Sequence, residues 1–222
     1  MNGICSPVNA YQEAVKKLRG IDPGEAARRT GARFDPDGGR LEIVYFGSLY
    51  LVDTEGNVSR AGNPGEEVPY NDRTLIIQYL CDSTGLQPRG SWISFLQLPD
   101  GAHHYAPFQN EAAGPLARVF GRRPEKFAEA ARALGGTPLS IGDCSFLVPA
   151  LPRLPLAVAI WEEDDEFPAS GNILFDSVSP MHLTTAALWV LGIELANKMI
   201  SHFDPDTGRG RKITWLEGVR ND

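Results

Sequence analysis

Three short apolar runs in the second half of the chain constrain its fold more than any other feature. They are residues 144–148, 156–161 and 173–175, and each is bounded by proline, glycine or acidic residues. Runs of this length, partly β-branched or aromatic, are typical of buried strands rather than helices. Several prolines lie in the turn after the first run, and five consecutive acidic residues follow the second run. The sequence therefore predicts adjacent antiparallel strands here, with Trp161 and Phe175 as core residues.

Helix signals occur on both sides of this segment. A serine or aspartate directly before a proline is typical of a helix start, and it occurs at Ser6, Asp22 and Ser179. Gly31 is a typical end for the second of these helices. Apolar residues recur at helical spacing in further ranges, and the predicted helices are 7–19, 24–30, 71–81, 112–120, 124–134 and 181–200.

Additional strands are predicted in the first half of the chain. Residues 41–46 and 49–52 are rich in β-forming side chains, and Gly47-Ser48 between them is typical of a type II′ hairpin turn. A third strand near Val58 would complete a meander, but the loop-like composition of 62–67 argues against it. Residues 91–95 alternate polar and apolar, as a half-buried strand does. We predict a single α+β domain over 1–202, mainly antiparallel sheet with flanking helices, and a C-terminal tail at 203–222.

Charge and composition exclude some classes of partner. The chain has 222 residues and a formal net charge of −7, with its 21 Lys and Arg scattered. This argues against nucleic acid and anionic membranes as partners, because both require a basic face. No signal-peptide core and no run of about 18 apolar residues occurs, so we expect a soluble, cytoplasmic protein. Three widely spaced cysteines predict neither a disulfide nor a metal knuckle.

No short catalytic signature is present. The chain lacks G-x-S-x-G, the P-loop, G-x-G-x-x-G and H-E-x-x-H. His103 and His104 are the only adjacent histidines, and we place them in a solvated loop, where neighbouring side chains point opposite ways and cannot chelate one ion. Catalytic residues therefore cannot be assigned from motifs.

The acidic turn at 162–166 is the sharpest local feature. In the simpler interpretation it is a solvated turn without a binding role, because adjacent carboxylates repel one another and point into solvent. In the competing interpretation, burial of Trp161, Phe167 and Pro168 holds the turn rigidly and lets acids converge on a basic partner or a cation. We expect no high-affinity metal site. The candidate ligand- or partner-binding residues are Trp161, Asp164, Asp165, Glu166, Phe167, Asp176, His103 and His104.

The order of several short segments resembles a known family. These segments include Gly90 to Phe95, Phe120-Gly121, Gly142-Asp143, Leu151 to Leu156, Trp161 to Pro168 and Ile173 to Asp176. Together they are similar to the domain of unknown function numbered 3786, and the likeness covers about 8–200. The resemblance implies a protein of anaerobic bacteria or archaea, often encoded near corrinoid, methyl-transfer or iron–sulfur genes. The family has no established catalytic residues, and this chain lacks the cysteine motif that some relatives carry.

Two functions follow as hypotheses. The first is a non-catalytic binding or accessory protein of anaerobic metabolism that recognises a tetrapyrrole or corrinoid cofactor or a partner protein. The missing signatures and the resemblance motivate it, although they leave the cofactor unknown. The alternative is a metal-assisted hydrolase or transferase that uses the acidic turn with His103, His104 or His182. A cleft in which acids and a histidine converge would favour the enzyme, whereas an apolar pocket would favour binding.

Overall fold

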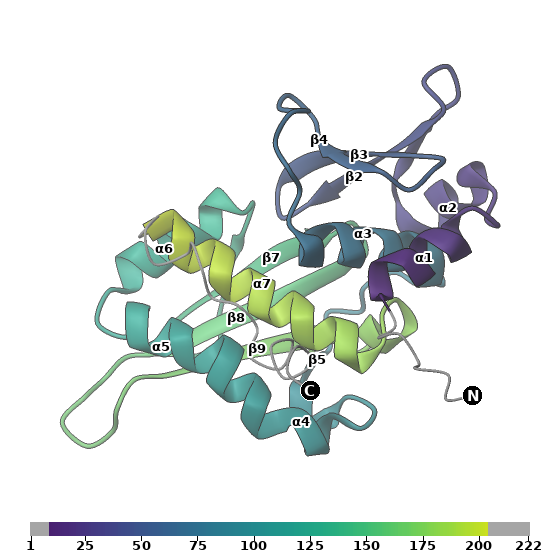
Figure 1. Cartoon of the computed structure of the whole chain (residues 1–222). Coiled ribbons are helices and arrows are strands. Elements are labelled where there is room, and N and C mark those ends of the chain that lie inside the picture. Colours follow the sequence, from purple (N-terminus) through teal and green to yellow (C-terminus); the bar gives the residue numbers. More distant parts are fainter. Residues whose placement is uncertain (1–8, 204–222) are drawn as a thin grey trace, which may run out of the picture.

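The first part of the chain builds a small antiparallel sheet with helices beside it (Figure 1). The structure, a computed structural model, describes residues 9–203. The four strands of the small sheet are paired in sequence order. The elements of this part are α1 (Ala10–Leu18), α2 (Pro23–Thr30), β1 (Arg33–Asp35), β2 (Arg40–Tyr45), β3 (Ser48–Asp53), β4 (Val58–Arg60) and α3 (Tyr70–Asp82). The strand at Val58, which the sequence argued against, is therefore present.

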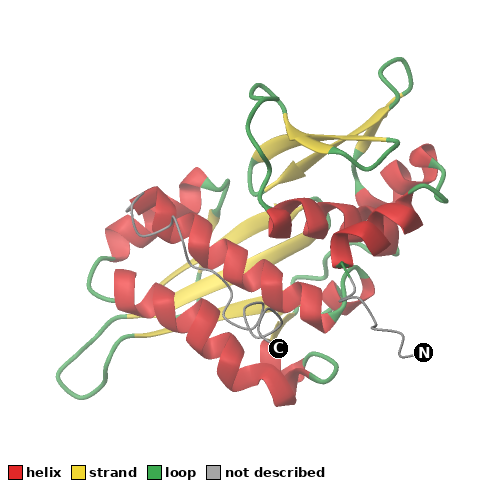
Figure 2. Cartoon of the chain, in the orientation of Figure 1, coloured by secondary structure: helices red, strands yellow, loops and turns green. Residues whose placement is uncertain are grey.

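The second part of the chain builds a larger antiparallel sheet in the order β5-β9-β8-β7-β6. Its elements are β5 (Trp92–Ser94), a 3-10 turn (Phe95–Gln97), α4 (Gly101–Phe108), a π-helical turn (Gln109–Ala113), α5 (Gly114–Phe120), α6 (Pro124–Ala133), β6 (Thr137–Leu139), β7 (Cys144–Leu151), β8 (Leu154–Trp161), β9 (Ser170–Asp176), a second 3-10 turn (Ser179–Met181) and α7 (Thr185–Phe203). Figure 2 shows α7 running across this sheet beside α4 and α5. The predicted α+β class is confirmed, with two antiparallel sheets.

The central strands form the core as the apolar runs predicted. β8 pairs with β7 on one side and with β9 on the other, and Leu156 to Ile160 are all buried. Phe175 of β9 is fully buried and contacts Phe95 and Phe108, whose rings stack with centroids 4.2 Å apart. Burial of several aromatic side chains at one point stabilises the contact between this sheet and α4.

Several element ends differ from the prediction. The hairpin turn between β2 and β3 consists of Phe46 and Gly47, both at positive φ, which is type I′ rather than II′. The last helix begins at Thr185 instead of Met181, because a separate turn at Ser179 lets His182 and Leu183 be buried before the helix starts. Asp22, Pro23 and Gly31 bound α2 as predicted. The expected start at Ser6 lies outside the described residues, and α1 is capped by Asn9.

A buried carboxylate on α3 connects the small sheet to α7. Asp72 is 1% exposed, accepts a hydrogen bond from the Tyr45 hydroxyl at 2.8 Å and pairs with Lys198 Nζ at 2.7 Å. The Lys198 ammonium also lies 5.1 Å from the centre of the Tyr45 ring and 5.7 Å from that of Phe46. Burial and the neighbouring Asp72 raise the pKa of Tyr45 well above its usual value, so the hydroxyl stays protonated as a donor.

A second contact at the same junction involves the backbone. The amide of Phe46 donates to the carbonyl oxygen of Ala150 in β7 at 3.0 Å, which links the hairpin of the small sheet to the large sheet. Phe46 is 4% exposed although its φ of 44° is uncommon for a residue other than glycine. Burial of its ring against Tyr45 and Lys198 stabilises this conformation.

We predict that Lys198→Met lowers the free energy of unfolding by about 3 kcal/mol, because it leaves the Asp72 carboxylate buried without its cation. Tyr45→Phe removes one hydrogen bond to the same carboxylate and should lower it by about 1–2 kcal/mol. Urea unfolding followed by circular dichroism measures both changes. Lys126→Met, which removes an exposed pair with Glu129, is the control and should leave the midpoint unchanged. Equal midpoints for Lys198→Met and the control would show that the buried pair does not stabilise the junction.

Candidate functional site

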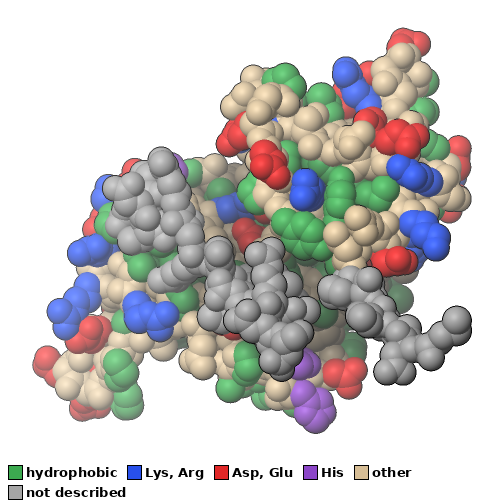
Figure 3. Space-filling view, in the orientation of Figure 1, with side chains coloured by type: hydrophobic (Ala, Val, Ile, Leu, Met, Phe, Trp, Pro, Cys, Tyr) green, Lys and Arg blue, Asp and Glu red, His purple; other side chains and the backbone are tan. Residues whose placement is uncertain are grey.

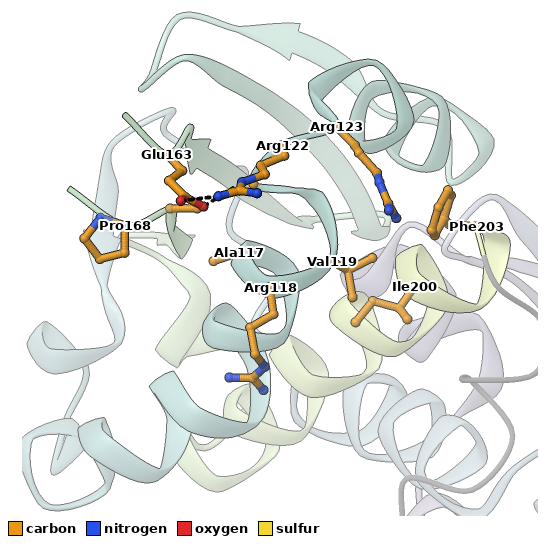
Figure 4. A pocket seen from close by; sticks show the side chains of 11 residues that line it. Ala117, Arg118, Val119, Arg122, Arg123, Glu163, Pro168, Ile200 and Phe203 are labelled. Carbon is orange, nitrogen blue, oxygen red and sulfur yellow. Dashed lines mark hydrogen bonds and ion pairs between the residues drawn. The ribbon is translucent and has the colours of Figure 1, made fainter. Parts of the chain in front are cut away.

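A pocket of about 600 Å³ lies where α5 ends, between the β8–β9 loop (residues 162–169) and the end of α7. Figure 4 shows the side chains that surround it. Arg118 comes from α5, Arg122 and Arg123 come from the turn between α5 and α6, and Glu163 comes from the loop. Of the residues that the structure describes, three cations and one anion thus line the pocket, an excess of two positive charges on a chain with net charge −7. We call it the arginine pocket.

Apolar side chains supply the rest of the arginine pocket. Val119 of α5 and Ile200 and Phe203 of α7 lie on one side, and Pro168 lies on the loop side (Figure 4). The Phe203 ring also lies 5.3 Å below the Arg123 guanidinium carbon, which is cation–π distance. The pocket is therefore partly apolar and partly cationic, as sites for organic anions are.

The three guanidinium groups differ in what they contact. Arg122 donates from Nε to Glu163 Oε2 at 2.8 Å and from Nη2 to Glu163 Oε1, so the pair is bidentate (dashed lines in Figure 4). This bond lowers the pKa of Glu163 and raises that of Arg122. Within residues 9–203, neither Arg118 nor Arg123 has a carboxylate partner. Two of the three arginines are therefore open to an anion, and Figure 3 shows Lys and Arg side chains gathered over α5 and α6.

A close approach at Gly121 holds the loop against α5. A Cβ atom at this position would lie 2.2 Å from the Ala169 Cβ and 2.6 Å from the Ala117 carbonyl oxygen. The Glu163 amide donates to the Gly121 carbonyl oxygen at 3.3 Å in the same contact. Any side chain at 121 would therefore move the loop away from the helix and change the shape of the arginine pocket.

The loop itself is arranged differently from the prediction. Phe167 is 66% exposed, Trp161 is 37% exposed and Pro168 is exposed as well, so the predicted burial of these three side chains was wrong. Trp161 is the last residue of β8, paired with Ser170 where the loop leaves the sheet. The conformation of the loop is held by carboxylates that accept hydrogen bonds from backbone amides, and not by buried aromatic rings. Asp164 Oδ1 accepts from the amides of Glu166 and Phe167, and Asp143 Oδ2 accepts from that of Glu162.

The other predicted candidates do not join this site. Asp176 is fully buried and accepts from the amides of Arg89, Gly90 and Val178. It ends β9, about 20 Å from Ser170 at 3.3 Å per residue. Its role in the structure is to order the chain before β5. Asp165 and Glu166 are exposed on the loop.

The histidine pair lies in a helix instead of the expected loop. His103 and His104 are in α4, whose start after Asp100 and internal Pro107 hid the helical pattern. His104 packs against Trp189 with ring centres 5.3 Å apart. Among residues 9–203, no three His, Cys, Asp or Glu side chains are placed to share a metal ion.

A serine–histidine contact elsewhere resembles a nucleophile and its base. Ser83 Oγ lies 2.8 Å from His182 Nδ1, but both side chains are 0% exposed. Burial lowers the pKa of His182. A substrate cannot reach either atom in this conformation, so we assign the pair to the packing of the second 3-10 turn against the end of α3. Cys81 and Cys144 are free thiols, and burial raises their pKa values.

Residues 22–198 match the family described as Domain of unknown function (DUF3786). The chain belongs to this family. No curated protein and no solved structure matches the chain. In this member of the family, the arginine pocket combines two residues of one turn with residues far along the chain. In the sequence, the adjacent Arg122 and Arg123 after Gly121 are a signal of this pocket, which was not among the predicted sites. None of the helices in 9–203 is long and apolar enough to cross a membrane.

The lowered pKa of His182 predicts a pH dependence of stability. The unfolded chain takes up a proton near the usual histidine pKa of about 6.5, whereas the folded chain does so only at lower pH. The unfolded state thus binds more protons in this range, and the free energy of unfolding falls as the pH falls below about 6.5. We expect this fall to be smaller in His182→Gln, measured by urea unfolding at pH 7.5, 6.5 and 5.5. His104→Gln is the control on an exposed ring, and identical pH slopes for His182→Gln and the unaltered protein would contradict the assignment.

Proposed function

We propose that this protein is a non-catalytic binding protein and that it binds an organic anion of cofactor size in the arginine pocket. The observation that carries this proposal is the pairing of two open guanidinium groups, Arg118 and Arg123, with an apolar wall from Val119, Ile200 and Phe203. A volume of about 600 Å³ is within the range of small-molecule sites. Guanidinium groups match the planar geometry of carboxylates and phosphates.

A tetrapyrrole or corrinoid cofactor is the ligand class that we propose. Protoporphyrin-like rings combine a large apolar body with carboxylate side chains, and both halves of that chemistry have a counterpart in the pocket lining. The family resemblance implies an accessory role in anaerobic metabolism, and we place that role in the cytoplasm. The negative charge of such a ligand is attracted to the excess of cations in the pocket, whereas the rest of the chain is acidic and would repel it.

A partner protein is the second candidate, and the exposed Phe167 ring favours it. A ring that is 66% exposed among acidic neighbours resembles an anchor for an apolar socket with a basic rim. A metal-assisted hydrolase or transferase ranks below both. Glu163 is paired with Arg122, Asp164 orders its own turn, and His103, His104 and His182 belong to other elements, so no cleft joins these acids to a histidine.

The binding proposal is tested by absorbance titration with protoporphyrin IX and with cobyrinic acid, a corrinoid with free carboxylates, as probes. We expect at least one of the two to bind, and the double variant Arg118→Gln/Arg123→Gln to weaken its binding at least tenfold through the loss of two guanidinium contacts.

The matched control is Arg28→Gln/Arg89→Gln, which removes the same charge from two exposed arginines outside the pocket. It should leave affinity within about twofold. Equal losses in both double variants would mean that net charge, rather than the arginine pocket, governs binding. An absence of binding by both probes would overturn the proposed ligand class.

A further inference from the structure

The carboxylate of Glu163 holds Arg122 in the geometry that an external carboxylate would adopt. Two parallel N–H groups of one guanidinium donate to the two oxygens of one carboxylate, which is the bidentate arrangement by which arginine binds carboxylate ligands. Arg118 and Arg123, which line the same pocket, have no carboxylate partner within residues 9–203. The pocket therefore has two open cations and a third whose binding position is filled from within the chain.

The pair is weakly held because it is exposed. The side chains of Arg122 and Glu163 are 76% and 38% exposed, and exposed ion pairs contribute little to stability because water and salt screen them. A ligand carboxylate placed in the pocket can therefore compete with Glu163 for Arg122, because breaking the exposed Arg122–Glu163 pair costs little free energy.

The loop that carries Glu163 is attached in a way that allows this exchange. Its first residue is held by the bond from the Glu162 amide to Asp143, and its last by the contact of Ala169 with Gly121. Between these points, the turn organised by Asp164 is bonded within the loop itself. Glu163 reaches the body of the protein through Arg122 and through one amide bond to Gly121 at 3.3 Å.

We infer that Glu163 stands in for a carboxylate of the ligand, and that the ligand displaces it from Arg122. This inference rests on the proposed function and adds to it the class of the anion and the event that accompanies binding. The ligand's carboxylate takes both N–H groups of Arg122, and the Glu163 side chain leaves the pocket. Glu163 is thus a specificity residue. A ligand without a carboxylate forms no ion pair with Arg122, so nothing offsets the loss of the Arg122–Glu163 pair when such a ligand binds.

The decisive variant is Glu163→Gln, with Glu162→Gln as its control. Both remove one negative charge from neighbouring positions of the loop, but only the first frees Arg122. The probes are protoporphyrin IX, which has two carboxylates, and its dimethyl ester, which has the same ring without them. Glu163→Gln should bind protoporphyrin IX about two- to fivefold more tightly than the unaltered protein, a gain typical of removing an exposed competing pair. Glu162→Gln and the dimethyl ester should show no such gain.

A double-mutant cycle assigns the gain to Arg122. In the Arg122→Gln background, Glu163→Gln should no longer increase affinity, because the group that it frees is absent. Hydrogen exchange gives a second readout. The amide of Glu163, whose acceptor is the Gly121 carbonyl outside the loop, should exchange faster in protein saturated with protoporphyrin IX, whereas a loop that closes over its ligand would exchange more slowly.

The outcomes separate this inference from the proposed function. Binding that depends on Arg118 and Arg123 but is unchanged or weakened in Glu163→Gln would overturn the inference and leave the pocket as a binding site. Slower exchange of the loop on binding would also overturn it. Failure of protoporphyrin IX to bind either the unaltered protein or Glu163→Gln would overturn this inference, and only if the corrinoid probe also fails to bind is the proposed ligand class overturned as well.

Discussion

The ion pair between Asp72 and Lys198 is the interaction on which the relative placement of the two sheets depends. It is buried on the Asp72 side and joins residues that are 126 positions apart in the chain. The Tyr45 hydroxyl and the rings of Tyr45 and Phe46 complete the surroundings of the two charges. A buried carboxylate without a partner is strongly unfavourable, so each alternative packing of α3 against α7 that separates the charges is disfavoured.

The position of α7 in turn shapes the arginine pocket. Lys198 is held against α3, and Ile200 and Phe203 follow within the next two turns of the same helix. They provide the apolar wall opposite the turn that carries Arg122 and Arg123. A polar contact of α7 with α3 thus helps to position a binding surface that begins only a few residues further along the same helix. The large sheet provides the remaining side, because β8 and β9 hold both ends of the acidic loop.

The acidic loop has a different role from the one that its composition suggests. Two of its carboxylates already accept hydrogen bonds from a nearby amide or guanidinium, because Asp164 orders the turn and Glu163 holds Arg122. A third carboxylate, Asp143, lies outside the loop just before β7 and holds Glu162. The loop is ordered by short-range hydrogen bonding, and its aromatic side chain at 167 remains exposed.

Local sequence determined several elements of this protein and left others, together with the assembly of all of them, open. The three apolar runs predicted β7, β8 and β9, and Asp22-Pro23 with Gly31 predicted the ends of α2, because the apolar pattern of a strand and the capping of a helix are set by neighbouring residues. The exposure of Trp161, the helix at His103 and the arginine pocket depend on which distant segments pack together. Arg122, Glu163 and Ile200 are far apart in sequence, and only the tertiary structure, through the packing of α5, the β8–β9 loop and α7, brings them to one site.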